Sequence, residues 1–66
     1  MPRTFEELAK MIADRDGISY NEAMNCVKQV AMDMEHAFYN GSLNEAEDIL
    51  KEELGLEPDY LDIFIY

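Results

Sequence analysis

Apolar residues recur at three- and four-residue intervals along most of this chain, which is the spacing of amphipathic helices. Three hydroxyl residues each stand three positions before a glutamate, a pattern typical of helix N-termini. These pairs are Thr4 with Glu7, Ser19 with Glu22, and Ser42 with Glu45. Gly17, Asn40-Gly41 and Gly55 follow the periodic segments as stop signals. The pattern predicts helices over about 5–14, 19–40 and 43–54.

Each expected helix has one apolar side. The stripes are Phe5, Leu8, Ala9 and Ile12; then Tyr20, Ala23, Met24, Val27, Val30, Ala31, Met34, Ala37 and Phe38; then Leu43, Ala46, Leu50 and Leu54. Cys26 lies at the flank of the second stripe, where we expect it to be buried as a small apolar side chain. On the third helix, Glu47 and Lys51 have the i,i+4 spacing of a helical ion pair.

A second stripe lies on the opposite side of the long helix, where Met32, His36 and Tyr39 stand at i, i+4 and i+7. We interpret the long helix as central, with the C-terminal segment folded over this stripe. The alternative is that these three residues form a contact with a second copy or with a partner.

The last segment, residues 60–66, has six apolar residues out of seven. Pro58 suits the first turn of a helical element, and a strand here would have no partner strand, so we expect a helical turn docked on the core. The predicted fold is all-α, a small bundle of three helices plus a short C-terminal helical turn, in a single domain over 1–66. Because so short a chain buries only about 60% of its unfolded surface, a partner or second copy would add stability.

Charge is unevenly distributed. The net charge is −10, and residues 33–66 hold ten acidic residues against Lys51 alone, whereas residues 1–32 hold five against four basic residues. A field of that sign repels nucleic acid and anionic membranes and attracts cationic proteins. The expected partner is therefore a basic protein, with no direct nucleic-acid or membrane binding. One cysteine and the lack of a long apolar run favour a cytoplasmic location.

Few residues suit catalysis or metal binding. Cys26 and His36 are the only nucleophile and base of the usual types, and ten residues of helix would separate them by about 15 Å. Asp33 and His36 give half of a carboxylate-bridged metal site, and no second copy of that motif exists. We expect no enzymatic activity, no metal and no cofactor.

The acidic residues of the third helix are the main candidates for partner binding. Opposite its apolar stripe, Glu45, Asp48 and Glu52 follow one another at about 4.5 to 6 Å along the axis, comparable to the spacing of phosphates in nucleic acid. An ordinary solvated helix face has the same pattern. Further acidic candidates are Glu53, Asp59 and Asp62, and the apolar anchor candidates, where accessible, are Tyr60, Phe64 and Tyr66.

Two resemblances extend this reading. Residues 5–41 predict a short helix, a Gly-x-Ser turn and a long helix, with the segments Phe5-Glu6-Glu7-Leu8-Ala9, Asp16-Gly17-Ile18-Ser19, Ala37 and Asn40-Gly41. This order of elements resembles the N-terminal helix-turn-helix of HU-type nucleoid proteins. That resemblance implies an intertwined helical dimer. It does not imply DNA binding, because the chain continues into acidic sequence instead of basic β-arms.

The whole chain, especially Asp48-Ile49-Leu50 and residues 54–60, resembles small acidic helical proteins of phages and prophages of Gram-positive bacteria. The resemblance implies a setting more than a mechanism, and in that setting short acidic proteins often act by occupying the basic groove of a host or defence protein. Our first hypothesis is thus a non-enzymatic acidic binding module that mimics nucleic acid. The alternative is a small helical homodimer with a structural or regulatory assembly role, in which Met32, His36 and Tyr39 meet their symmetry mates.

Overall fold

Hydroxyl caps begin the three main helices where the sequence predicted them. The computed structural model describes residues 2–65. It contains α1 (Phe5–Asp16), α2 (Tyr20–Tyr39) and α3 (Leu43–Ile49). The side-chain oxygens of Thr4, Ser19 and Ser42 accept hydrogen bonds of 3.1 to 3.2 Å from backbone N–H groups three residues later. Each oxygen satisfies a donor that has no partner within the helix.

Glycines end the helices. Gly17, Gly41 and Gly55 have φ of 67°, 72° and 66°, the left-handed conformation that glycine adopts without a Cβ penalty. After α1, the N–H of Ile18 donates to the carbonyl of Ala13 at 3.1 Å. After α2, the N–H of Ser42 donates to the carbonyl of Ala37 at 3.1 Å. These five-residue steps are the 6→1 bonds of the Schellman motif. The predicted stop signals are confirmed.

The second half of the predicted third helix is a π-helix, η1 (Leu50–Leu54). At its end the N–H of Leu56 donates to the carbonyl of Leu50, six residues earlier, at 3.3 Å. The corresponding bonds after α1 and α2 reach back five residues. The ion pair expected between Glu47 and Lys51 is not formed. Within residues 2–65 the one ion pair joins Arg15 and Asp16.

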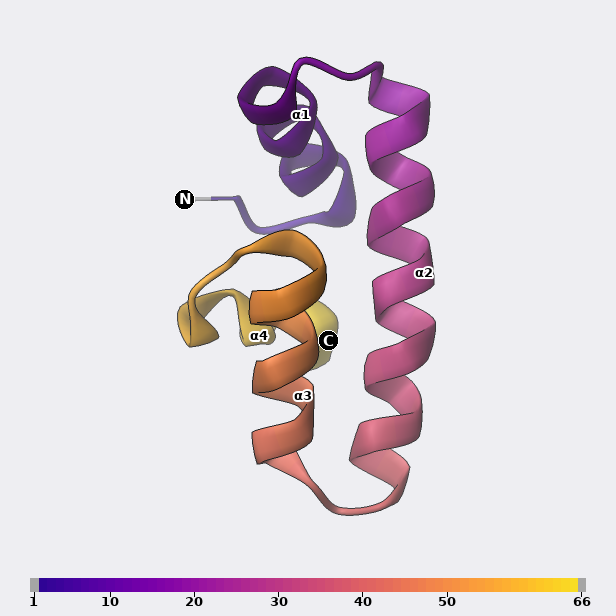
Figure 1. Cartoon of the computed structure of the whole chain (residues 1–66), viewed down its shortest axis with the longest axis vertical. Coiled ribbons are helices and arrows are strands. Elements are labelled where there is room, and N and C mark those ends of the chain that lie inside the picture. The colour runs from indigo at the N-terminus through magenta and orange to yellow at the C-terminus, as the bar shows by residue number, and fades with distance from the viewer. Residues whose placement is uncertain (1, 66) are drawn as a thin grey trace.

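The C-terminal segment folds back as a short helical turn, as predicted. A 3-10 turn, η2 (Pro58–Tyr60), leads into α4 (Leu61–Ile65), and Leu61 and Ile63 are buried. Figure 1 shows α2 running the length of the molecule, with α1 beside its first half and α3 beside its second half, both on the same side of α2. The fold is all-α, and the molecule measures 33 × 20 × 19 Å.

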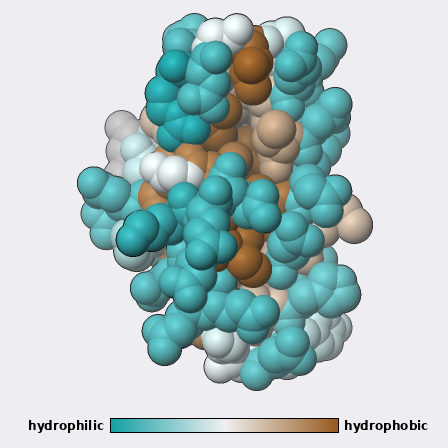
Figure 2. Space-filling model, in the orientation of Figure 1, coloured by the Kyte–Doolittle hydropathy of each residue, from teal (hydrophilic) through white to brown (hydrophobic). Residues whose placement is uncertain are grey.

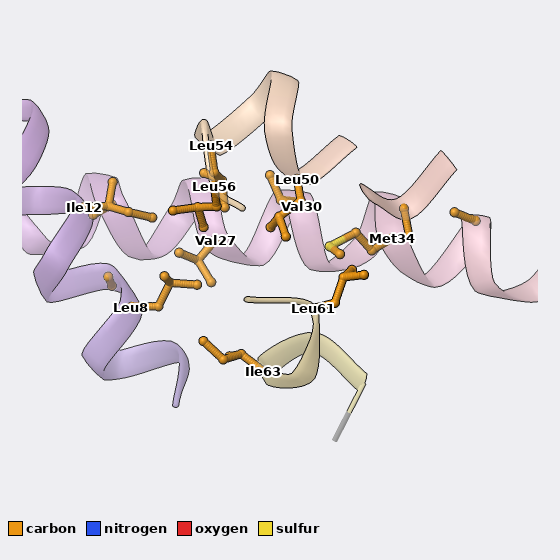
Figure 3. Close-up of a cluster of buried hydrophobic side chains, with 14 residues drawn as sticks. Leu8, Ile12, Val27, Val30, Met34, Leu50, Leu54, Leu56, Leu61 and Ile63 are labelled. Atoms are coloured by element: carbon orange, nitrogen blue, oxygen red, sulfur yellow. The ribbon is translucent and has the colours of Figure 1, made fainter. Parts of the chain in front are cut away.

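The core lies where these helices meet (Figure 3). Its largest fully buried side chains are Leu8, Ile12, Met34, Leu50 and Val27. Every buried residue between positions 2 and 65 is apolar, and no buried side-chain nitrogen or oxygen there lacks a hydrogen-bond partner. Apolar burial therefore holds the fold together without a polar network.

Three expectations about burial are wrong. Cys26 is exposed, although it neighbours the buried Val27. Leu43 is 57% exposed, because it begins α3 at the end of the bundle. The C-terminal segment does not cover the second stripe of α2, whose Met32 and Tyr39 are 59% and 86% exposed. That segment packs instead against α1.

Candidate partner-binding surface

The predicted acidic row lies along α3 and η1 with its side chains in solvent. Glu45 stands in the first turn of α3, where its N–H donates to Ser42 Oγ at 3.2 Å, and Asp48 follows one turn later. Glu52 belongs to η1. All three are exposed. Figure 2 shows hydrophilic side chains covering the part of this face formed by α3 and η1, with apolar side chains visible between them and α2.

Among residues 2–65, almost all of the carboxylates are without a basic partner. The exception is Asp16, whose two oxygens accept from Arg15 Nε at 2.9 Å and Nη2 at 3.1 Å. This hydrogen bonding lowers the pKa of Asp16 and raises the pKa of Arg15. In the part of the chain that the structure describes, no carboxylate of α3, η1, η2 or α4 has an ion-pair partner. The negative potential of this half is therefore not neutralised internally.

A shallow hollow of about 500 Å³ lies between α3 and the η2–α4 segment. Two exposed apolar side chains from different elements line it: Leu43 begins α3, and Ile65, 51% exposed, ends α4. Of the residues that the structure describes, Leu43, Glu47, Pro58, Asp59, Leu61, Asp62 and Ile65 line it. The hollow therefore combines apolar side chains with three carboxylates.

A second hollow of about 450 Å³ adjoins the first, since Glu47 and Pro58 line both. Its lining is Glu47, Asp48, Lys51, Gly55, Leu56, Glu57 and Pro58. We call the two hollows together the acidic trough. From the described residues, five carboxylates and one lysine line the trough, beside an apolar set of Leu43, Leu56, Pro58, Leu61 and Ile65.

The structure brings only some of the predicted site residues into the trough. Asp48, Asp59 and Asp62 line it, whereas Glu45 and Glu52 do not. Glu53 lines a separate hollow of about 250 Å³ beside Cys26 and Leu54. The predicted acidic residues therefore do not share one hollow.

The predicted aromatic anchors are accessible only in part. Tyr60 is half-buried, and its hydroxyl donates to the sulfur of Met11 at 3.7 Å. Phe64 is half-buried against Phe5, with ring centroids 5.3 Å apart. Tyr66 lies outside the described residues. Tyr60 and Phe64 thus hold the C-terminal turn to α1, and Leu43 and Ile65 present more of their apolar surface to solvent.

Sequence reasoning missed Leu43, Glu47 and Ile65 as members of this surface. Leu43 was assigned to a buried stripe and Glu47 to an ion pair. The available signal was the position of Leu43 in the first turn of its helix, where fewer neighbours can cover a side chain. For Ile65 the sequence holds no comparable signal, because its exposure depends on how α4 docks.

The second stripe of α2 forms a separate exposed surface. Met32, His36 and Tyr39 are all exposed, and none of them lines the trough. Between residues 2 and 65, no group of three or more His, Cys, Asp or Glu side chains is arranged to hold a metal ion. No helix among the same residues is both long enough and apolar enough to cross a membrane.

Comparison of the chain with protein-family models, curated proteins and solved structures gave no match.

Proposed function

We propose that this protein is a non-enzymatic binding module whose acidic C-terminal half docks on a basic surface of another protein. The observation that carries the proposal is the acidic trough together with the exposed row of Glu45, Asp48 and Glu52 beside it. In this region carboxylates without ion-pair partners surround exposed apolar side chains. Charge of one sign speeds the encounter with a basic partner, while burial of apolar side chains supplies most of the affinity.

In its sharper form, the proposal is that the module acts as an inhibitor that competes with nucleic acid. The row along α3 and η1 supports this form, because its axial spacing is comparable to that of backbone phosphates. The resemblance to phage and prophage proteins supports a host or defence protein as the partner. A cytoplasmic location belongs to the same proposal.

Affinity capture tests the proposal. The immobilised full chain would be exposed to a lysate of the source organism and washed at increasing salt, and retained proteins would then be eluted with duplex DNA. We expect retention of a basic protein at low salt, its loss at high salt, and its release by DNA. Retention that resists both salt and DNA would contradict the mimic.

A pair of matched variants shows whether α3 and η1 form the binding face. The triple variant Glu45→Lys, Asp48→Lys, Glu52→Lys should lose the captured protein. The control Glu6→Lys, Asp14→Lys, Glu35→Lys places the same charge change at exposed positions of α1 and α2 and should keep it. Equal loss in both variants would mean that net charge alone, and not this face, drives capture.

One observation favours a second candidate function, the helical homodimer. Met32 and Tyr39 are 59% and 86% exposed on α2, so the stripe is free to meet a second copy. Sedimentation of the wild type and of Met32→Ser/Tyr39→Ser distinguishes this function from the first. A dimer that the double variant abolishes would support it, and a monomer at high concentration would remove it.

A further inference from the structure

The acidic trough has the form of a helix-binding groove. One side is α3, from which Leu43 and Glu47 contribute at a spacing of one helical turn. The other side is the η2–α4 segment, which contributes residues 58, 61, 62 and 65. This i, i+3, i+4, i+7 spacing presents one helix face to the hollow. A third helix placed between the two would pack against ridges on both sides.

The side chains in the trough form an apolar centre with an acidic rim. Leu56 and Leu61 are buried and form the floor, while Leu43 and Ile65 keep more than half of their surface in solvent. The rim carboxylates are Glu47, Asp48, Glu57, Asp59 and Asp62, and among residues 2–65 the one base beside them is Lys51. A ligand that matches this surface has an apolar stripe flanked by lysine or arginine.

The other common modes of peptide recognition do not suit this surface. Addition of a strand requires a sheet edge, and residues 2–65 form no strand. Polyproline ligands require an aromatic-lined groove, and among residues 2–65 no aromatic side chain lines the trough. Recognition of phosphorylated or acidic motifs requires a cluster of arginines. Of these four modes, an amphipathic helix seated in an apolar groove is the one that suits the trough.

We propose that the acidic trough binds a cationic amphipathic helix of the partner, with that helix's apolar residues between Leu43 and Ile65. This inference rests on the proposed function and specifies the part of the basic partner that is recognised. The stretch of α3 and η1 from Leu43 to Lys51 spans about 12 Å at 1.5 Å per residue. The trough therefore holds about two turns of the partner helix.

A peptide pair tests the inference. The probe is an 18-residue lysine–leucine peptide whose leucines share one helix face, and the control has the same composition with the leucines scattered around the helix. Binding to the full chain is measured by fluorescence anisotropy in 0.1 M salt. We expect the ordered peptide to bind at least about tenfold more tightly than the scrambled one, because only it presents an apolar stripe.

Substitutions on the protein locate the peptide. Leu43→Asn/Ile65→Asn should weaken binding of the ordered peptide at least about tenfold, because it removes apolar contact at the centre of the interface. Met32→Asn/Tyr39→Asn, a similarly exposed apolar pair on α2, should leave binding unchanged. Equal weakening by both pairs would overturn the inference. If a variant fails to fold, amide chemical shifts of the wild type provide the test. The ordered peptide should change the chemical shifts of residues 43–47 and 58–65. Changes confined to α2 would overturn the inference.

The peptide pair also separates this inference from the proposed function. Equal, salt-dependent binding of both peptides would overturn the helix-in-groove inference but agree with an acidic docking surface. Binding of neither peptide would overturn the inference, and the capture experiment would still decide the proposed function. If the wild type forms a dimer and Leu43→Asn/Ile65→Asn dissociates it, a second copy occupies the trough. That result would also overturn the helix-in-groove inference.

Discussion

The ring of Phe5 packs against the ring of Phe64 with centroids 5.3 Å apart and ring planes tilted by 44°. This contact joins the first residue of α1 to the last helical turn. Tyr60, whose hydroxyl donates to the sulfur of Met11, makes a second link between the same two regions. Together they hold α4 in place, and α4 forms one side of the acidic trough.

We predict that Phe5 and Phe64 stabilise the fold cooperatively. A double-mutant cycle with Phe5→Ala and Phe64→Ala should give a coupling energy of about 1 kcal/mol, the usual value for a tilted aromatic pair. Urea unfolding of the four proteins measures it. Strictly additive effects would show that the rings do not interact in solution and that α4 is held by Leu61 and Ile63 alone.

Glu52 and Glu53 should lower the stability of the fold. Both lie in the last turn of the α3–η1 helix, at the negative end of the helix dipole. Glu52→Lys/Glu53→Lys should raise the melting temperature by about 4 °C, since removal of each unfavourable charge contributes up to about 1 kcal/mol. The control Glu6→Lys/Glu7→Lys makes the same charge change in the first turn of α1 and should lower it. A rise in both variants would assign the effect to net charge.

Gly55 should tolerate asparagine better than alanine. Its φ of 66° is left-handed, and an added Cβ would meet the nearest atom, Arg15 Nη1, at 3.8 Å, which is an ordinary contact. The penalty for Gly55→Ala is therefore backbone strain of about 1 kcal/mol, and Gly55→Asn should cost less. Denaturant unfolding measures both, with the exposed Glu57→Ala as a near-neutral control. A destabilisation by alanine no larger than that of the control would contradict the left-handed helix end.

The Arg15–Asp16 pair should give a small pH-dependent contribution. The hydrogen bond from Arg15 holds the pKa of Asp16 below its ordinary value of 3.8. Because the folded pKa is the lower one, the pair stabilises the fold above the unfolded pKa and loses this effect as the pH falls through the folded pKa. Asp16→Asn should therefore be less stable than the wild type near neutral pH and equally stable in strong acid. The residues are neighbours, so the unfolded chain keeps part of the contact and the difference is small. Urea titrations at both pH values measure it.

The sequence predicted the helices well because their signals are local. Each hydroxyl cap and each glycine acts within a few residues, and the structure confirms these starts and stops. The π-turn was not predictable in this way. Leu50 and Leu54 are four residues apart, a spacing that keeps both side chains on one side in an α-turn and in the wider π-turn alike.

The trough could not be predicted, because it depends on tertiary contacts. The sequence shows that Leu43 is on an apolar stripe, but not that the neighbouring helices leave it uncovered at the end of the bundle. Nor does it show that residues 58–65 return beside Glu47, which requires the reversal at Gly55. Asp48, Asp59 and Asp62 were predicted from charge alone, and charge gave no information on which of the predicted acidic residues share one surface.

We propose above all that the acidic C-terminal half attracts a basic protein through this face. The most direct test is the association rate constant of the captured basic protein, measured across salt concentrations for the wild type and the two triple lysine variants. We predict that the wild-type association rate falls steeply as the salt concentration rises. At low salt, the variant Glu45→Lys, Asp48→Lys, Glu52→Lys should associate at least about tenfold more slowly than the control Glu6→Lys, Asp14→Lys, Glu35→Lys, because steering depends on the local potential. A wild-type rate that salt does not change, or equal rates for the two variants, would contradict the claim.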